Sequence, residues 1–315
     1  MRYKYVKLLI KTKLIHNAIR ASKKIILPGF EGMSFYVVTK FFFLGIFNGN
    51  LNMRAQSLAF SFFLALFPSV IFLFTLIPYI PIEHFQDSLL NLLQTLLPKS
   101  AFEATEETIQ DIIKNQRGGL LSVGFISALY FSTNGFNEMM NAFNETYHII
   151  ETRSAIKQRF VSILLVIITT LSVSIAITLI IFSEIGLQHL FEKDRVVYYL
   201  LLIGKWFVLV ILCFFFISIN YYLGPKRKRG FNFFSPGAIL ATVLTITTTV
   251  LFAYYVNNFA NYNKLYGSIG TLIVMMLLIY INSLILLLGF DLNASIVGAK
   301  KKTGRQNQII IPSKD

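Results

Sequence analysis

The sequence predicts an all-α integral membrane protein with six transmembrane helices and additional amphipathic interfacial helices. The composition gives the first indication: 55% of the 315 residues are hydrophobic, 14% are charged, and the mean hydropathy is +0.63. A typical soluble domain is about 45–50% apolar and about 25% charged. The excess apolar surface must therefore face lipid. This excludes a soluble globular enzyme, a disordered chain and a coiled coil.

Long apolar stretches give the second indication. A helix needs about 20 mostly apolar residues to cross about 30 Å of hydrocarbon. Six stretches satisfy this requirement, with the second becoming polar after Phe131. They are residues 55–81, 119–147, 160–186, 196–223, 236–259 and 268–297.

Two further segments are expected at the membrane surface. Residues 35–47 are apolar but too short to cross a bilayer, carry Lys40 and end in a turn-rich sequence. They suit an interfacial or re-entrant helix. Before them, an apolar residue recurs every fourth position among lysines, which predicts a basic amphipathic helix on the inner surface. The first 34 residues lack the features of a secretory signal peptide, so none is expected.

The basic residues predict the orientation. Alternate connections carry 22 Lys and Arg on one side and 6 on the other. By the positive-inside rule, both termini are cytoplasmic in the inner (cytoplasmic) membrane. The expected organisation is a basic N-terminal segment (1–54), a membrane domain (55–297) and a basic cytoplasmic tail (298–315). We expect an outer loop at about 82–118 to form a packed helical cap. The alternative is that this loop is a partner-binding site.

The formal charge of +14 suggests nucleic-acid binding as an alternative function. The basic residues are concentrated in the alternate connections, so the positive-inside rule explains them and no nucleic-acid partner is expected. The expected partners are membrane lipids, with anionic head groups at the cytoplasmic face. Envelope proteins or further copies of the chain remain as additional partners.

A stripe of amides and carboxylates follows the second stretch. Steps of three and four residues place its members on one side of a helix. They are Asn134, Asn137, Glu138, Asn141, Asn144 and Glu145, with His148 beyond them. Unpaired polar groups in lipid cost several kcal/mol each, so the stripe must face protein or water. It predicts a polar substrate cavity, with hydrogen bonding between helices as the alternative.

Other polar residues are candidates to line the same cavity or to pair across it. Gln56, Ser57 and Ser61 share one face of the first stretch, and Asp291 lies near the inner end of the sixth. We expect Asp291 to pair with Arg54 or Arg153. A structural ion pair is favoured over a role in a transport site.

No catalytic residues, metal site or cofactor are expected. The four histidines are scattered without metal-ligand spacing, and Cys213 is the single cysteine. The sequence contains no P-loop and no nucleophile-elbow motif.

Several stretches resemble the YihY/BrkB family, over roughly residues 35–298. The most specific are NYNKLYGSIG (261–270) and LLGFDLNA (287–294). Two departures are mild: Ile279-Tyr280 stands where many members have a Trp-containing pair, and Asp291 where glutamate is commoner. The resemblance implies a six-helix bacterial inner-membrane protein without a settled activity. Members have been linked to serum resistance and to export of envelope lipid or lipopolysaccharide, and the family once carried the label ribonuclease BN.

These observations favour a transporter or flippase-like translocator of a lipid or another amphipathic envelope molecule. Two alternatives stay open. One is a non-transporting envelope scaffold that acts through its outer loop and basic tails. The other, favoured least, is a membrane-bound hydrolase of the kind that the ribonuclease label suggests.

Overall fold

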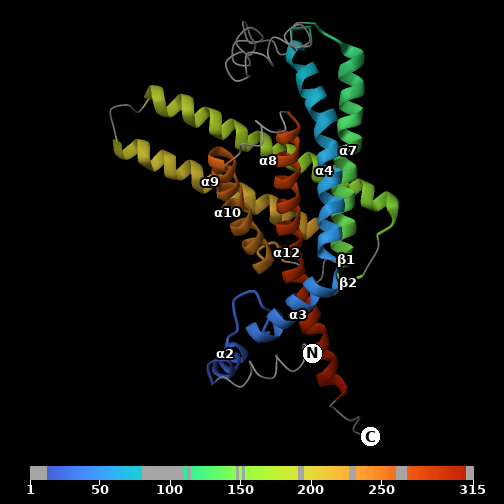
Figure 1. Ribbon diagram of the computed structural model, residues 1–315, viewed down its shortest axis with the longest axis vertical. Coiled ribbons are helices and arrows are strands. Elements are labelled where there is room, and N and C mark those ends of the chain that lie inside the picture. Colours follow the sequence, from blue (N-terminus) through green and yellow to red (C-terminus); the bar gives the residue numbers. More distant parts are fainter. Residues whose placement is uncertain are drawn as a thin grey trace. The chain divides into compact units, whose positions relative to one another are not determined.

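The computed structural model describes residues 13–79, 110–111, 115–146, 149–150, 153–190, 195–226, 232–259 and 268–309. Helices make up nearly all of this part of the chain (Figure 1). They are α2 (Lys13–Lys24), α3 (Phe35–Asn48), α4 (Leu51–Leu76), α7 (Gly118–Asn144), α8 (Ala155–Leu190), α9 (Arg195–Leu223), α10 (Pro236–Phe259) and α12 (Ser268–Ile309). A single 3₁₀ turn, η1 (Ile77–Tyr79), follows α4, and two short strands follow α7. The all-α class is confirmed.

Five of these helices contain a segment long and apolar enough to cross a membrane. The segments are Leu51–Phe72, Ala155–Ala176, Ile203–Leu223, Pro236–Val256 and Leu272–Lys302. They show that the chain is a multi-pass membrane protein. Helix α7 has 27 residues and is about 40 Å long, but its polar second half keeps it out of this set. Six crossings therefore remain a prediction.

The second predicted stretch does not continue as a helix to residue 147. Helix α7 ends at Asn144, and strand β1 (Glu145–Thr146) pairs antiparallel with strand β2 (Ile149–Ile150). Because Glu145 pairs with Ile150 in this ribbon, its placement on the helical stripe is wrong. His148, nearly all of the outer loop and the 261–267 part of the NYNKLYGSIG motif lie outside the described residues.

The chain forms two compact units, 1–59 with 137–315 and 60–136. The smaller unit pairs the second part of α4 with the first part of α7. Phe62 and Phe136 meet edge to face, with ring centroids 5.6 Å apart. A Cβ added to Gly135 would lie only 2.9 Å from the Phe62 ring, so the absence of a side chain lets these two helices approach closely.

Helix α12 packs against several elements of the larger unit, and its most extensive contact is with α10 (Figure 1). Gly237 of α10 and Gly289 of α12 face each other backbone to backbone. Next to this contact, the Asn293 side chain accepts a hydrogen bond from the Gly237 amide at 2.9 Å and donates one to the Ser235 hydroxyl at 2.9 Å. Small residues and a paired amide hold the two helices together, as is typical of membrane helices.

Beyond its contact with α10, α12 packs against α3. Buried Val38 of α3 and Ile296 of α12 form a small apolar core with Phe30. Phe30 lies in a tight connection that begins after α2. In this connection Gly29 has a φ of +84°, and the Cα of Gly29 lies against the ring of Pro236. Helix α3 is therefore a short helix attached to the part of α12 around Ile296. Its attachment at the surface of the bilayer stays a prediction.

Candidate functional site

Four polar side chains from three helices of the larger unit form a hydrogen-bonded chain, here called the polar ladder. Ser57 of α4 donates to Glu138 Oε1 of α7 at 2.5 Å. Asn141, one turn further along α7, donates to Glu138 Oε2 at 3.4 Å, and Gln158 of α8 donates to Asn141 Oδ1 at 2.6 Å. The Gln158 amide also approaches the Asn137 carbonyl oxygen at 3.4 Å. Polar groups thus connect α4, α7 and α8.

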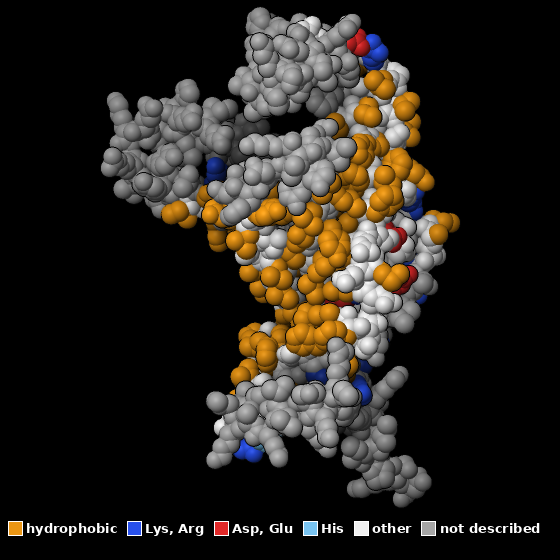
Figure 2. All heavy atoms as spheres, viewed as in Figure 1, with side chains coloured by type: hydrophobic (Ala, Val, Ile, Leu, Met, Phe, Trp, Pro, Cys, Tyr) orange, Lys and Arg blue, Asp and Glu red, His pale blue; other side chains and the backbone are white. Residues whose placement is uncertain are grey.

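The polar ladder is only partly covered by protein. Ser57 is exposed, Glu138 and Asn141 are half-buried, and Gln158 is buried. Ser57 and Gln158 both belong to segments apolar enough to cross the membrane. On the face that Figure 2 presents, white and red side chains interrupt the hydrophobic surface. Polar groups on the outside of membrane helices require a polar partner, because lipid tails offer none.

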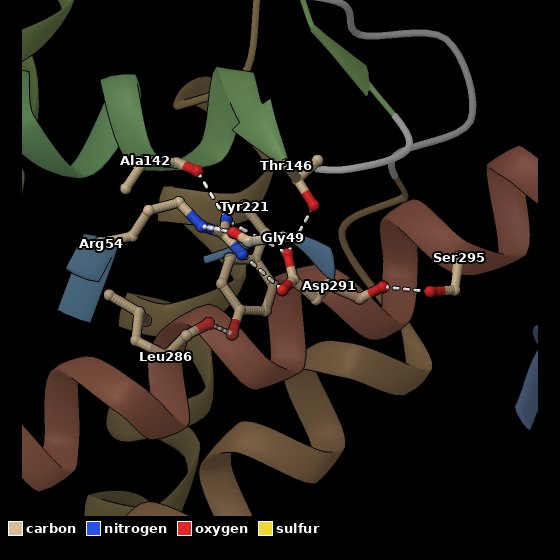
Figure 3. Close-up of polar contacts among 8 residues, drawn as sticks. All are labelled: Gly49, Arg54, Ala142, Thr146, Tyr221, Leu286, Asp291 and Ser295. Carbon is tan, nitrogen blue, oxygen red and sulfur yellow. Dashed lines mark hydrogen bonds and ion pairs between the residues drawn. The ribbon is translucent and has the colours of Figure 1, made fainter. Parts of the chain in front are cut away.

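A second polar group is fully buried and lies around Asp291 of α12 (Figure 3). Arg54 forms a two-pronged contact with its carboxylate, with Nη2 2.7 Å from Oδ2 and Nη1 3.3 Å from Oδ1. The Thr146 hydroxyl donates to Oδ1 at 2.6 Å. Arg54 also donates to the carbonyl oxygens of Gly49 at 3.0 Å and Ala142 at 2.8 Å. The guanidinium thus joins α4, α7 and α12 to the connection that precedes α4.

Aromatic packing surrounds this ion pair. Phe143 of α7 stacks on Phe290 of α12 with centroids 4.1 Å apart, and Tyr221 of α9 meets both rings edge-on. The Tyr221 hydroxyl donates to the Leu286 carbonyl oxygen at 2.6 Å (Figure 3). Buried charges persist where they are paired and hydrogen-bonded. The Asp291 group therefore has the features of a structural anchor.

Of the two arginines considered for Asp291, the structure places Arg54 there. Arg153 instead donates to the carbonyl oxygens of Leu223 at 3.4 Å and Pro225 at 2.9 Å, just after the end of α9. Burial lowers the pKa of the Arg153 guanidinium from its ordinary value, yet arginine stays charged at neutral pH. Its position favours a role in holding the end of α9.

The remaining predicted residues lie in different surroundings. Asn144 is buried and accepts a hydrogen bond from the Lys226 amide at 2.9 Å, so it braces a connection. Gln56 and Glu145 are exposed. Ser61 and Asn134 belong to the smaller unit, whereas the polar ladder belongs to the larger one.

Two residues of these networks were missed by the sequence reasoning: Gln158 and Thr146. Gln158 lies two residues before the predicted start of the third stretch, between Lys157 and Arg159. An amide in such a position is interpreted as a solvent-exposed residue of the connection between two helices. A helix beginning at Ala155 would have shown it facing the bundle. The sequence does not indicate the contact between Thr146 and Asp291, because the turn that brings the two residues together depends on the β1–β2 ribbon.

The polar ladder offers a carboxylate and several amide and hydroxyl groups, which can hydrogen-bond a polar head group. No ion pair among the described residues includes Glu138. Within the same part of the chain, no three His, Cys, Asp or Glu side chains are grouped so that they could hold a metal ion. These features define a multi-pass α-helical membrane protein with a partly exposed network of polar side chains.

The chain belongs to the family described as virulence factor BrkB, whose model matches residues 44–309. The expected membership of the YihY/BrkB family is thereby confirmed. The Bacillus subtilis protein YfkH, whose name calls it ribonuclease-like, is 34% identical over 257 residues, covering 79% of this chain and 90% of that protein. The UPF0761 membrane protein NTHI0384 of Haemophilus influenzae is 24% identical over 247 residues, covering 78% and 90%.

A UPF0761 membrane protein of Histophilus somni is likewise 24% identical over 262 residues, covering 82% of this chain and 89% of that protein. No solved structure matches the chain. The relatives agree with the membrane location that the apolar helices define.

Proposed function

We propose that this protein translocates a lipid or another amphipathic envelope molecule, whose head group moves along the polar ladder while its apolar part stays in the bilayer. The observation that supports this proposal best is the partly exposed chain of hydrogen bonds from Ser57 through Glu138 and Asn141 to Gln158. A purely structural network would be expected to lie inside the bundle, where its groups are shielded from lipid.

The surface beside the polar ladder suits the apolar part of such a molecule. Ile156 and Phe160, which flank Gln158 on α8, are 81% and 77% exposed. Met53 of α4 is also strongly exposed, one turn from Ser57. A polar track beside lipid-facing apolar side chains would let a head group exchange its hydration for hydrogen bonds without removing the acyl chains from the bilayer.

Glu138 is the better candidate of the two carboxylates for binding a coupling proton or cation. Its hydrogen-bond partners in the polar ladder, Ser57 and Asn141, are neutral. Asp291 is held by Arg54 and is fully buried. Because the sequence contains no nucleotide-binding motif, we expect transport to be passive, ion-coupled or driven by a partner protein.

The test is lipid exchange between leaflets in proteoliposomes, measured with fluorescent phospholipids of several head groups and with imposed ion gradients. We expect the wild type to exchange lipid and Glu138→Gln/Asn141→Leu to lose at least about tenfold in rate, which corresponds to about 1.4 kcal/mol of lost stabilisation. Glu145→Gln is the matched control, because Glu145 is an exposed carboxylate outside the polar ladder. It should exchange lipid at the wild-type rate.

Two outcomes would contradict the proposal. Equal exchange by the double variant and the wild type would remove the polar ladder from the path. No exchange by well-folded wild type under any of these conditions would favour the scaffold alternative instead. Because the name of YfkH includes a ribonuclease-like activity, the same preparations should be incubated with RNA, and we expect no cleavage that depends on Glu138.

A further inference from the structure

We propose that a lobe built from both ends of the described chain binds the anionic phospholipids of one leaflet. This interfacial lobe consists of residues 13–48, which include α2 and α3, together with residues 292–302 of α12. None of its side chains belongs to the polar ladder, so this binding does not depend on the translocation that we propose above.

The length of α12 places the lobe at the depth of the head groups. Its apolar segment, Leu272–Lys302, has 31 residues and extends over about 46 Å. The hydrocarbon core needs about 20 residues, whereas the full bilayer with its head groups measures about 40–45 Å. Because the segment ends in Lys300, Lys301 and Lys302, we place Leu272 at the opposite boundary of the hydrocarbon core and the last third of the segment in the head-group layer. Helix α3 packs on that third, where Phe30 and Val38 contact Ile296.

Helix α3 presents an apolar stripe on the side away from α12. Phe43, Leu44 and Phe47 are exposed, with Phe47 at 80%, while Val38 and Gly45 are buried. Positions three and four residues apart share one face of a helix, so these three side chains form one surface. Figure 2 shows hydrophobic side chains gathered over α3, with lysine or arginine side chains below them. An apolar stripe of this kind inserts at the boundary between head groups and acyl chains.

Lysine side chains contact other residues of the lobe. The lobe has eight basic residues and one acid, Glu31. The Lys23 ammonium lies 5.2 Å from the centre of the Tyr36 ring, and that of Lys302 lies 5.9 Å from the centre of the Phe41 ring. Lys300 contacts Glu31 at 2.7 Å. Rings and carboxylate thus hold charges from α2 and α12 beside α3, where lipid phosphates would meet them.

The position of α3 is tested by spin labels on the full-length protein in nanodiscs of phosphatidylcholine and phosphatidylglycerol. Cys213→Ser removes the single cysteine, after which Phe47→Cys and Lys301→Cys are labelled separately. We expect the label at 47 to be relaxed by oxygen and shielded from a water-soluble nickel chelate, and the label at 301 to respond to nickel. Nickel access at 47 equal to that at 301, or shielding of 47 from both reagents, would overturn the proposal.

The charge requirement is tested by binding of fluorescent phosphatidylglycerol to the protein in detergent. One lysine near an anionic surface contributes about 1 kcal/mol, or roughly a fivefold change in affinity. Lys23→Gln/Lys302→Gln should therefore bind roughly 25-fold more weakly, with phosphatidylcholine binding unchanged. The matched control is Lys205→Gln, because Lys205 also lies over an aromatic ring, Trp206, at 5.9 Å, but on α9.

Unchanged phosphatidylglycerol binding by the double variant, or an equal loss in Lys205→Gln, would overturn the charge requirement. If the double variant fails to fold, as judged by size-exclusion chromatography, the spin-label measurement still decides the position of α3. The expected pattern is lipid contact at 47 together with anionic-lipid binding that depends on Lys23 and Lys302.

Discussion

Two carboxylates of the larger unit differ in their partners, and this difference separates structure from proposed function. Asp291 is fully buried and accepts hydrogen bonds from Arg54 and Thr146. Glu138 is half-buried and accepts from Ser57 and Asn141, which are uncharged. Any change of partner at Asp291 would leave the Arg54 guanidinium buried without a counter-charge. Only Glu138 is therefore free to exchange partners without breaking a buried ion pair.

At the residue scale, Asp291→Asn should destabilise the protein by about 3–5 kcal/mol, because it leaves the Arg54 guanidinium buried without a counter-charge. The measurement is the free energy of unfolding in detergent, followed by circular dichroism. Arg54→Met/Asp291→Leu is the matched comparison, since it removes both charges and should recover part of the loss. Stability of Asp291→Asn equal to that of the wild type would show that the pair contributes nothing.

Glu138→Gln should leave the free energy of unfolding within about 1 kcal/mol of the wild type, because glutamine keeps the size of the side chain and can still accept from Ser57. The same denaturation measurement tests this prediction. A loss as large as that of Asp291→Asn would mean that the polar ladder holds the bundle together, which is the hydrogen-bonding alternative to a substrate cavity.

At the scale of elements, the contact between α10 and α12 depends on two glycines. A Cβ on Gly289 would lie 2.5 Å from the Gly237 carbonyl oxygen and from the Tyr221 hydroxyl. Backbone atoms cannot move aside as a flexible side chain can. The helices can therefore approach this closely only without side chains at these positions.

Gly289→Ala should accordingly lower the thermal stability of the protein, at a cost of about 1–3 kcal/mol for overpacking. Gly204→Ala is the control, because nothing lies within 4 Å of a Cβ at that position of α9. Alanine is a better helix former than glycine, so this variant should be as stable as the wild type or more stable. A thermal denaturation series in detergent compares the two, and equal losses would contradict the close-contact explanation.

Helix positions could be predicted well because lipid imposes length and apolarity on each crossing. The predicted stretch 236–259 coincides with α10, and 196–223 falls within one residue of α9. The end of α7 could not be predicted, since Glu145 continues the polar spacing although it belongs to a strand. The hydrogen-bond partners in the polar ladder could not be predicted from the sequence either. Pairing Ser57 with Glu138 requires knowing which helices lie next to each other.

At the scale of the whole molecule, we predict that α7 crosses the membrane as a sixth span. The positive-inside pattern requires it, since the connections at both ends of α7 differ in charge. Helix α7 is long enough, and its polar groups would be tolerated because Glu138 and Asn141 are hydrogen-bonded to other helices.

Cysteine labelling in spheroplasts tests this crossing. In a Cys213→Ser background, Asn115→Cys should react with a membrane-impermeant maleimide in intact spheroplasts. Lys226→Cys and Lys301→Cys should react only after permeabilisation, because both positions are expected on the cytoplasmic side. Protection of Asn115→Cys until permeabilisation would place both ends of α7 on the same side and reduce the number of crossings to five.

The buried pair of Arg54 and Asp291 also has a consequence for how the protein is made. The two residues are 237 positions apart, and ribosomes add about 5–20 residues per second. For roughly 10–50 s, the emerging chain therefore contains Arg54, in the first helix long enough to cross the membrane, before its carboxylate partner has been synthesised. The last helix completes the assembly of the first, so a truncated product would expose an unpaired guanidinium that a membrane protease or chaperone can recognise.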